Sequence, residues 1–327
     1  MSTGIIYLST VGIKTEKLND LIISKINKID SNFDLKINQI NVKLNPFSLA
    51  IDLKTLGTDL IYKNKSIKLE SVKSQISIKS LINNYFALSE ITISTKSIPI
   101  KNLISLIRVI KNDSRLLLAE QVIENGFIIA DLELEFDKNG KIKKNFKIDG
   151  LVNDAQLIIS KKKISKLNFI FQITDKELYF DDIKLIINNK ILSIPELKAQ
   201  KEKNEFLFVG IVNNKNLNLK KNEIKEFINN DFLNDYFNYI TFNSKSNFTF
   251  KIDRKFKIKN LNIKSDFNVE KLEIDNFFEN NHFFPKIRKT IKFEKQKINL
   301  NYTKNKIDII GSGDIFIQNN LDAINYK

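Results

Sequence analysis

The sequence predicts a mainly β protein, built as one elongated antiparallel sheet with a few amphipathic helices inserted into it. Three observations support this fold class. Short segments alternate between apolar and polar residues along most of the chain, as half-buried strands do. Turn signals separate these segments at intervals of roughly 8–12 residues. No linker rich in Pro, Gly or Ser divides the 327 residues, so separate globular domains are not expected.

Residues 35–60, LKINQINVKLNPFSLAIDLKTLGTDL, show the alternation best. It slips by one residue after Ile37, breaks at Asn45-Pro46 and then resumes, while the opposite face carries Lys, Asn, Gln, Asp and Ser. Because a sheet must cover an apolar face, a second sheet, a layer of helices or a ligand has to contact it. The candidate residues of this face are Leu35, Ile37, Val42, Leu44, Ile51 and Leu53.

The same alternation continues through the later strands, where aromatic residues occupy the apolar positions. Four of them extend the candidate face: Phe169, Phe171, Phe248 and Phe250. With only 9 Gly and 4 Pro, the chain needs Asn, Asp and Lys for most of its turns. Turns are therefore expected at 62–66, 137–141, 187–190 and 212–216, and GSGD at 311–314 is expected to separate two strands.

Helices are expected where apolar residues recur at i, i+3, i+4 and i+7. Residues 15–31 fit this spacing, with Thr15 as a candidate cap, so residues 1–31 form a separate N-terminal segment. Residues 32–327 form the sheet, with helical insertions near 98–120, 221–240 and 276–292.

No catalytic, cofactor-binding or metal-binding signature is present. The chain has no Cys and one His, His282, which excludes thiolate chemistry and metal sites built from His pairs. Asp181 and Asp182 are adjacent in a predicted strand and so point to opposite faces. Glu133 and Glu135 share a face, but it is the outward face of an amphipathic strand. The sequence therefore predicts a protein that is not an enzyme and binds no cofactor.

The formal net charge of +15 admits two interpretations. Attraction to an anionic membrane or a nucleic acid is one, and Lys-rich solvated faces and sheet edges are the other. Phe and Lys alternate in the strands, so they lie on opposite faces and do not form a basic stacking platform. This arrangement favours solvated faces, although binding of a polyanion in a loop stays open.

The N-terminal stretch GIIYLSTVGI, residues 4–13, also has two interpretations. Its residue types favour a first strand. The alternative is the trailing end of a membrane helix whose beginning is missing from this chain, since ten apolar residues are about half a span. The membrane-proximal candidates are Ile5, Ile6, Leu8, Val11 and Ile13.

Several short patterns together resemble the AsmA-like superfamily of Gram-negative envelope proteins, of the AsmA, TamB and YhdP type. The break at Asn45-Pro46-Phe47 is followed by SIKLESVKSQISIKSL at 66–81, then by LSEITI at 88–93. Residues 123–157 resemble the repeated β-segments of the YhdP-like members. The family typically begins with one membrane helix, and this chain lacks most of it. By the resemblance, residues 4–13 are the last turns of that helix.

The resemblance implies a curled, taco-shaped β-groove that conducts phospholipids between the inner and outer membranes. It implies a periplasmic location with an inner-membrane anchor in the full-length protein, contact with the inner-membrane surface, and envelope protein partners; no nucleic acid is expected. The alternative from the residues alone is a structural or adhesive β-sandwich or solenoid with a dry core, because alternation does not distinguish a dry core from a lipid-lined groove.

Overall fold

The computed structural model forms two compact units, Met1–Leu178 (unit 1) and Tyr179–Lys327 (unit 2). The residues it describes are 2–20, 23, 32–83, 85, 87–111, 114–143, 145–159, 162–202, 205–227, 236–253, 257–275, 290–304, 306–317 and 320–327.

Within these residues, 18 strands belong to one long antiparallel sheet, which confirms the predicted mainly β class. The elements of unit 1 are α1 (Ser2–Thr10), β1 (Ile13–Thr15), β2 (Phe33–Lys36), β3 (Gln39–Asn45), β4 (Ala50–Tyr62), β5 (Lys65–Ser77), α3 (Ile78–Ile82), β6 (Leu88–Thr95), β7 (Ile98–Pro99), α4 (Ile100–Lys111), α5 (Ser114–Val122), β8 (Ile123–Glu135), β9 (Lys147–Ile159) and β10 (Lys162–Thr174). The later elements are β11 (Glu177–Ile187), which begins at the boundary, β12 (Lys190–Glu202), β13 (Glu205–Lys220), α6 (Lys221–Phe227), β14 (Phe237–Asp253), β15 (Ile258–Ile274), β16 (Ile291–Thr303), β17 (Lys306–Ile317) and β18 (Asn320–Tyr326).

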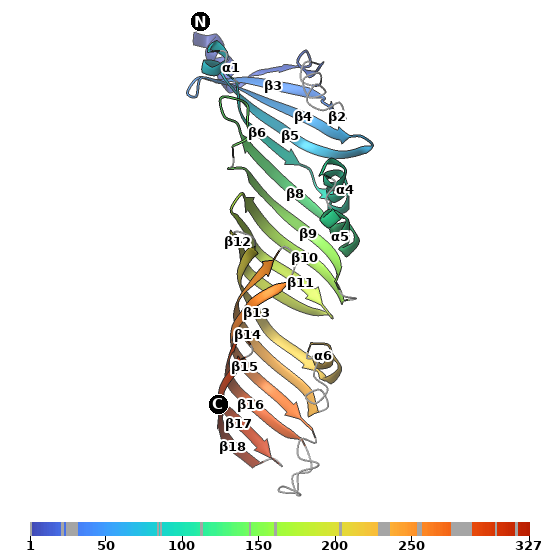
Figure 1. Ribbon diagram of the computed structural model, residues 1–327, viewed down its shortest axis with the longest axis vertical. Helices are drawn as coiled ribbons and strands as arrows, with labels where there is room; N and C mark the ends of the chain where they lie inside the picture. The colour runs from blue at the N-terminus through green and yellow to red at the C-terminus, as the bar shows by residue number, and fades with distance from the viewer. Residues whose placement is uncertain are drawn as a thin grey trace. The chain divides into compact units, whose positions relative to one another are not determined.

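Most strands pair with their neighbours in sequence. In unit 1, β3, β4, β5 and β6 pair in order, β6 pairs with β8, and β8, β9 and β10 follow. The short strands β1 and β2 pair with β3 and β4. In unit 2, β12 to β18 pair in strict succession. Figure 1 shows this succession as the order of colours within each unit.

Three of the four turns expected at Asn and Lys residues are turns. Lys63 follows β4, Asn188 and Asn189 follow β11 with positive φ, and Gly140 lies between β8 and β9. Positive φ at both central residues is what a type I′ hairpin turn requires. The Asn45-Pro46 break is also a turn, in which the amide N–H of Ser48 donates to Asn45 Oδ1 at 3.2 Å.

Two expected turns are wrong. Residues 212–216 lie inside β13, and the GSGD stretch lies inside β17, which runs unbroken from Lys306 to Ile317. At 212–216 the chain forms a bulge around Asn216, whose φ is 49°. Gly311 and Gly313 are needed for close approach rather than for turning, because a Cβ on them would collide with Tyr326 and Gln296.

Bulges recur along the long strands, whereas the slip in alternation after Ile37 falls between the end of β2 at Lys36 and the start of β3 at Gln39. Asn214 pairs with Ser244 and Leu217 pairs with Phe242. Three positions on β13 therefore span the same distance as two positions on β14, so β13 carries one extra residue. This bulge therefore keeps Leu217 on the same face as Phe242. The strand residues with positive φ are Gly57, Gly126, Asp154, Lys166, Asp182, Asn216, Asn260 and Lys295.

The helical predictions have mixed outcomes. The helices α4 and α5 occupy the insertion expected near 98–120. Near 221–240, α6 ends at Phe227, residues 228–235 lie outside the described residues, and Phe237–Ile240 belong to β14 instead of a helix. These last residues pair with both β13 and β15, and that pairing overrides their helical spacing. Most of the helix expected at 15–31 lies outside the described residues, and Thr15, its expected cap, ends β1 instead. Of the insertion expected at 276–292, residues 276–289 lie outside the described residues, and Ile291 begins β16.

Among the described residues, a buried apolar cluster lies in each unit. In unit 1, Leu106 of α4 packs on Tyr62, Ile67, Leu69 and Ile98 of the sheet. In unit 2, Ile224 of α6 packs on Leu217, Leu219, Phe242 and Val269. Each core lies between a short helix and the same apolar sheet face that carries the candidate residues.

Candidate functional site

The apolar face of unit 1 is assembled from strands β3 to β10. The register places Leu44 opposite Ile51 and Val42 opposite Leu53, so these four candidates share one face, as predicted. All four are half-buried. Farther along the same face, Phe171 of β10 lies opposite Gly150 and Phe169 lies opposite Val152, with the two rings 6.1 Å apart.

Helices cover part of this face. Leu106 of α4 belongs to the buried cluster of this face, and Leu103 and Val109 of α4 pack against that cluster. The strand residues that also pack against it are Leu60, Val72, Ile93 and Ile128. Figure 1 shows α4 and α5 together beside β8 and β9. Among the candidates, Leu35 and Phe171 are buried, each with 7% of its surface exposed, so neither offers much area to a ligand. Ile37 is half-buried, and its carbonyl accepts a hydrogen bond from Asn19.

The apolar face of unit 2 is aromatic. The ring of Phe250 stacks on Phe208 across the strands, with centroids 4.9 Å apart and planes 7° apart. It also stacks on Phe248 along β14 at 5.8 Å. The row continues from Phe248 to Ile263, Tyr302 and Ile307 on the next three strands. Ile307 keeps 60% of its surface exposed, so this row ends on an open apolar surface.

Three aromatic rings lie directly over glycines in the neighbouring strand. Phe171 covers Gly150, Phe248 covers Gly210 and Tyr326 covers Gly311, because a Cβ built on each glycine would lie 2.3–2.6 Å from the ring. Each pair is also a direct register pair. Because glycine has no side chain, a ring in this position packs directly against the backbone of the sheet and forms a shallow apolar surface.

A belt of polar side chains crosses the apolar face of unit 2. Asn214 donates to the hydroxyl of Ser244 at 2.9 Å, and the hydroxyl of Ser265 donates to that of Ser246 at 2.7 Å. Ser244 and Ser265 are buried. Along β14 this belt separates Phe242, under α6, from the stacked Phe248 and Phe250.

The opposite face is charged and solvated. Glu133 and Glu135 lie on it, as predicted, and Glu135 pairs with Lys143 at 2.9 Å. The hydrogen bond from Lys143 lowers the pKa of Glu135, so this carboxylate is an ordinary surface ion pair. Asp182 has positive φ and pairs with Lys184 at 2.9 Å. Within the described residues, no three acidic or His side chains come close enough to hold a metal ion. His282 lies outside the described residues.

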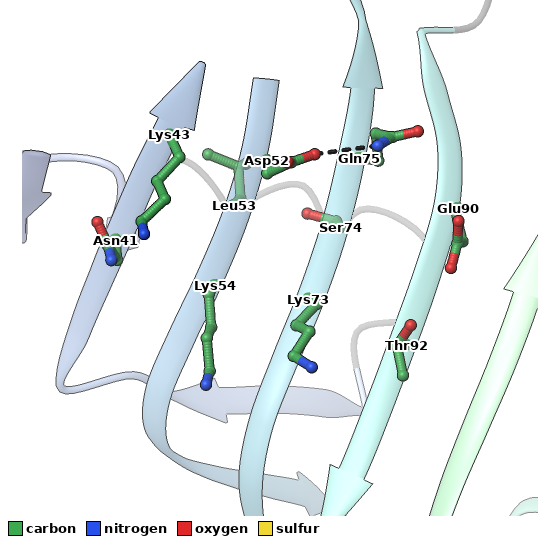
Figure 2. Close-up of a pocket in the computed structure, with 10 residues that line it drawn as sticks. All are labelled: Asn41, Lys43, Asp52, Leu53, Lys54, Lys73, Ser74, Gln75, Glu90 and Thr92. Atoms are coloured by element: carbon green, nitrogen blue, oxygen red, sulfur yellow. Dashed lines mark hydrogen bonds between the residues drawn. The ribbon is translucent and has the colours of Figure 1, made fainter. Parts of the chain in front are cut away.

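A cavity of about 460 Å³ opens on this charged face in unit 1 (Figure 2). Its lining residues are Asn41, Lys43, Asp52, Leu53, Lys54, Lys73, Ser74, Gln75, Glu90 and Thr92. Of these residues the sequence analysis named only Leu53, as a candidate of the apolar face. It did not name the polar residues, because Lys on a solvated strand face is common in this chain.

The N-terminal stretch is helical instead of a first strand. Ile5, Ile6 and Leu8 lie in α1, and the chain becomes β1 only at Ile13. Ile5, Ile6, Val11 and Ile13 are exposed, and Leu8 is half-buried. In the part of the chain that the structure describes, no helix has the length and apolar character to cross a membrane.

A second exposed apolar group lies at the β3–β4 turn. Phe47 is fully exposed at the tip of this turn, and Leu49 beside it is 60% exposed. The amide of Ile78, at the start of α3, donates to the carbonyl of Leu49 at 2.9 Å, which brings the exposed Ile82 and Tyr85 to the same end of the strands. Lys43, near this turn, donates to the carbonyl of Thr10 at the end of α1.

No protein-family profile, curated protein or solved structure matches this chain.

Proposed function

We propose that this protein binds the acyl chains of phospholipids on the apolar face of its sheet and conducts them without catalysing a reaction. The observation that carries the proposal is the aromatic face of unit 2. Phe208, Phe248 and Phe250 form a stacked, half-buried surface that continues to the exposed Ile307. These stacked rings, of which Phe248 covers Gly210, offer a shallow apolar surface on which a flexible chain can lie.

The energetics support a binding surface of this kind. Each CH₂ group moved from water to an apolar environment gains about 0.8 kcal/mol. A 16-carbon chain therefore costs on the order of 12 kcal/mol to pass through water. An apolar face removes most of this barrier, because a tail on the sheet and a tail in a bilayer are in similar surroundings. Transfer of this kind needs no chemical step.

The resemblance to the AsmA-like superfamily supports the same function. By that resemblance, the protein acts between the inner and outer membranes, in the periplasm, with an anchor in the inner membrane and envelope protein partners. The exposed apolar residues of α1, together with Phe47 and Leu49, support contact with a membrane surface. Apolar side chains beside lysines are typical of interfacial contacts.

The alternative, a structural or adhesive protein with a dry core, is supported by α4. Its residues seal part of the apolar face of unit 1 with the chain's own side chains. The proposed function predicts that lipid acyl chains contact the apolar face of unit 2, whereas the alternative predicts that no lipid contacts it.

Native mass spectrometry of the purified protein distinguishes them. Copurified phospholipid supports the proposal, and a protein that carries no lipid and takes none from vesicles overturns it. Salt-sensitive binding of a polyanion without lipid would favour a basic binding protein instead.

Single substitutions locate the lipid. Asp in place of Ile51, Phe169 or Phe250 should reduce lipid binding more than it reduces the free energy of unfolding. Thr249→Asp is the matched control, because Thr249 precedes Phe250 on β14 and faces the opposite side. Equal losses of binding and stability in the Phe250→Asp protein would indicate a dry core.

A further inference from the structure

The cavity on the charged face of unit 1 is not used by the proposed function, which concerns the opposite face. It lies across β3, β4, β5 and β6, where one row of register partners runs from Asn41 to Lys54, Lys73 and Thr92. Figure 2 shows the side chains of Lys54 and Lys73 extending side by side in the same direction.

In the part of the chain that the structure describes, no carboxylate forms an ion pair with either of these lysines. Lys54 and Lys73 are direct register partners, and like charges directly opposite each other in a sheet are destabilising. Within the described residues, neither ammonium group makes an ion pair or a side-chain hydrogen bond. The third lysine of the cavity, Lys43, donates to the carbonyl of Thr10 at 2.8 Å.

A second facing lysine pair in this protein shows the usual arrangement. Lys251 and Lys259 are register partners on β14 and β15. Lys251 lies 2.6 Å from Glu202, and Lys259 lies 3.1 Å from Glu205 and 3.2 Å from Asp253. Carboxylates from the chain therefore neutralise the pair in unit 2, whereas the pair that lines the cavity in unit 1 forms no such ion pair within the described residues.

The two acidic residues of the cavity belong to a different row. Asp52 and Glu90 flank Gln75, two residues along the strands from Lys54 and Lys73, which is about 7 Å. Asp52 already accepts hydrogen bonds from Gln75 at 3.1 Å and Asn45 at 3.4 Å. In the row with the two lysines, Lys54 also has Asn41 as a register partner and Lys73 also has Thr92, and both of these carry neutral donors. The row continues to Lys14 beyond Asn41 and to Glu133 beyond Thr92. Asn41 Oδ1 is buried and accepts no hydrogen bond within the described residues.

We propose that this cavity binds a phosphate group, with Lys54 and Lys73 as its cationic ligands and Asn41 and Thr92 as neutral donors. Lysine is a suitable phosphate ligand because it acts as a flexible point charge with three donors. The cavity has room for a phosphate together with the group that carries it. Free phosphate and a phospholipid headgroup share this chemistry.

The test is isothermal titration calorimetry of the full chain with inorganic phosphate. Wild type should bind one phosphate saturably, and the Lys54→Gln/Lys73→Gln protein should bind more than about tenfold more weakly, since two charge-assisted hydrogen bonds are lost. The Lys54→Arg/Lys73→Arg protein should keep binding because it keeps both charges.

A matched control removes the same charge elsewhere in unit 1. Lys96 and Lys101 are exposed and lie outside the cavity, so Lys96→Gln/Lys101→Gln should bind phosphate as wild type does. The unfolding temperature of the Lys54→Gln/Lys73→Gln protein should not fall, because it loses a repulsion. No saturable binding by wild type, or equal weakening in both Gln variants, overturns the proposal.

Two further arms identify the source of the phosphate. Glycerol 3-phosphate serves as the soluble ligand, and vesicles of phosphatidylcholine with and without phosphatidic acid serve as the membrane. Loss of vesicle binding in the Lys54→Gln/Lys73→Gln protein assigns a lipid headgroup, and loss confined to the soluble ligands assigns free phosphate. The Phe250→Asp protein should bind phosphate normally, so failure of this site and failure of the acyl-chain proposal give different results.

Discussion

The two units cover the same kind of apolar sheet face in different ways. In unit 1 the face is mainly aliphatic, and α4 contributes Leu106, which is 2% exposed, to a sealed core. In unit 2 the core beneath α6 ends at a belt of serines, and beyond it Phe248 and Phe250 stack on the open part of the face. One pattern of alternation therefore yields a face closed by a helix and a face finished by aromatic rings.

This difference shows what alternation leaves undetermined. Period-2 spacing decides which residues share a face, but the covering layer depends on elements elsewhere in the chain. Substitutions under α4 should therefore mainly lower the free energy of unfolding, as core mutations do. Substitutions among the stacked rings should mainly reduce lipid binding.

The largest expected effect is at the sealed core of unit 1. Leu106→Ala should lower the free energy of unfolding by about 2–5 kcal/mol, because it leaves a cavity between α4 and the sheet. Urea denaturation followed by circular dichroism measures this. The comparison variant is Phe250→Ala, which should cost less because the ring is only half-buried. Equal costs would mean that both faces are packed alike.

A smaller effect is expected at the glycine beneath Phe248. Gly210→Ala should cost about 1–3 kcal/mol, because its new methyl group would meet the ring at 2.6 Å and the Glu196 carbonyl at 3.1 Å. Near-ultraviolet circular dichroism should also change as the ring is displaced. Gly4→Ala is the control and should raise the free energy of unfolding slightly, because Ala favours a helix more than Gly does. Gly4 lies in α1, and a Cβ added there would have no atom within 4 Å. An unchanged spectrum in the Gly210→Ala protein would contradict the ring position.

The smallest expected effect concerns the attachment of α6. The amide of Lys220 donates to Glu223 at 2.8 Å, and Lys190 lies 3.0 Å from the same carboxylate. The Lys220 hydrogen bond holds the pKa of Glu223 below its usual value, and Lys190 lowers it further against the opposing effect of burial. The pKa of Glu223 is lower in the folded state than in the unfolded state. The charged carboxylate therefore stabilises the fold at pH values above its unfolded-state pKa, and this stabilisation is lost as the pH falls through its folded-state pKa.

Glu223→Gln should therefore lower stability by about 0.5 kcal/mol at neutral pH. The difference from wild type should vanish in acid, below the lowered pKa, where the wild-type carboxyl is protonated. Thermal unfolding at a series of pH values measures it. A difference that persists unchanged in acid would show that the charge is not responsible.

The sequence predicted the sheet and its faces because alternation is a local property. Val42, Leu44, Ile51 and Leu53 share a face as expected, and the break at Asn45-Pro46 is a turn. Phe248 and Phe250 were also placed correctly on one apolar face. Whether lipid contacts these residues stays a prediction.

Other features could not be predicted because they depend on partners in neighbouring strands. GSGD resembles a turn in sequence, yet Gly311 lies within β17 because the ring of Tyr326 covers it. Asn216 resembles a turn residue, yet it forms a bulge because Leu217 must rejoin the face of Phe242. The free lysine pair likewise depends on register, since Lys54 and Lys73 are 19 positions apart and meet only across β4 and β5.

The strict succession of strand pairs in unit 2 has a consequence for synthesis. From β12 onwards, each strand finds its partner in the segment made immediately before it. Loop closure between such neighbours is entropically inexpensive and fast. A nascent chain can therefore add strands to the growing edge as they leave the ribosome, so that only the newest edge is exposed to mispairing at any moment.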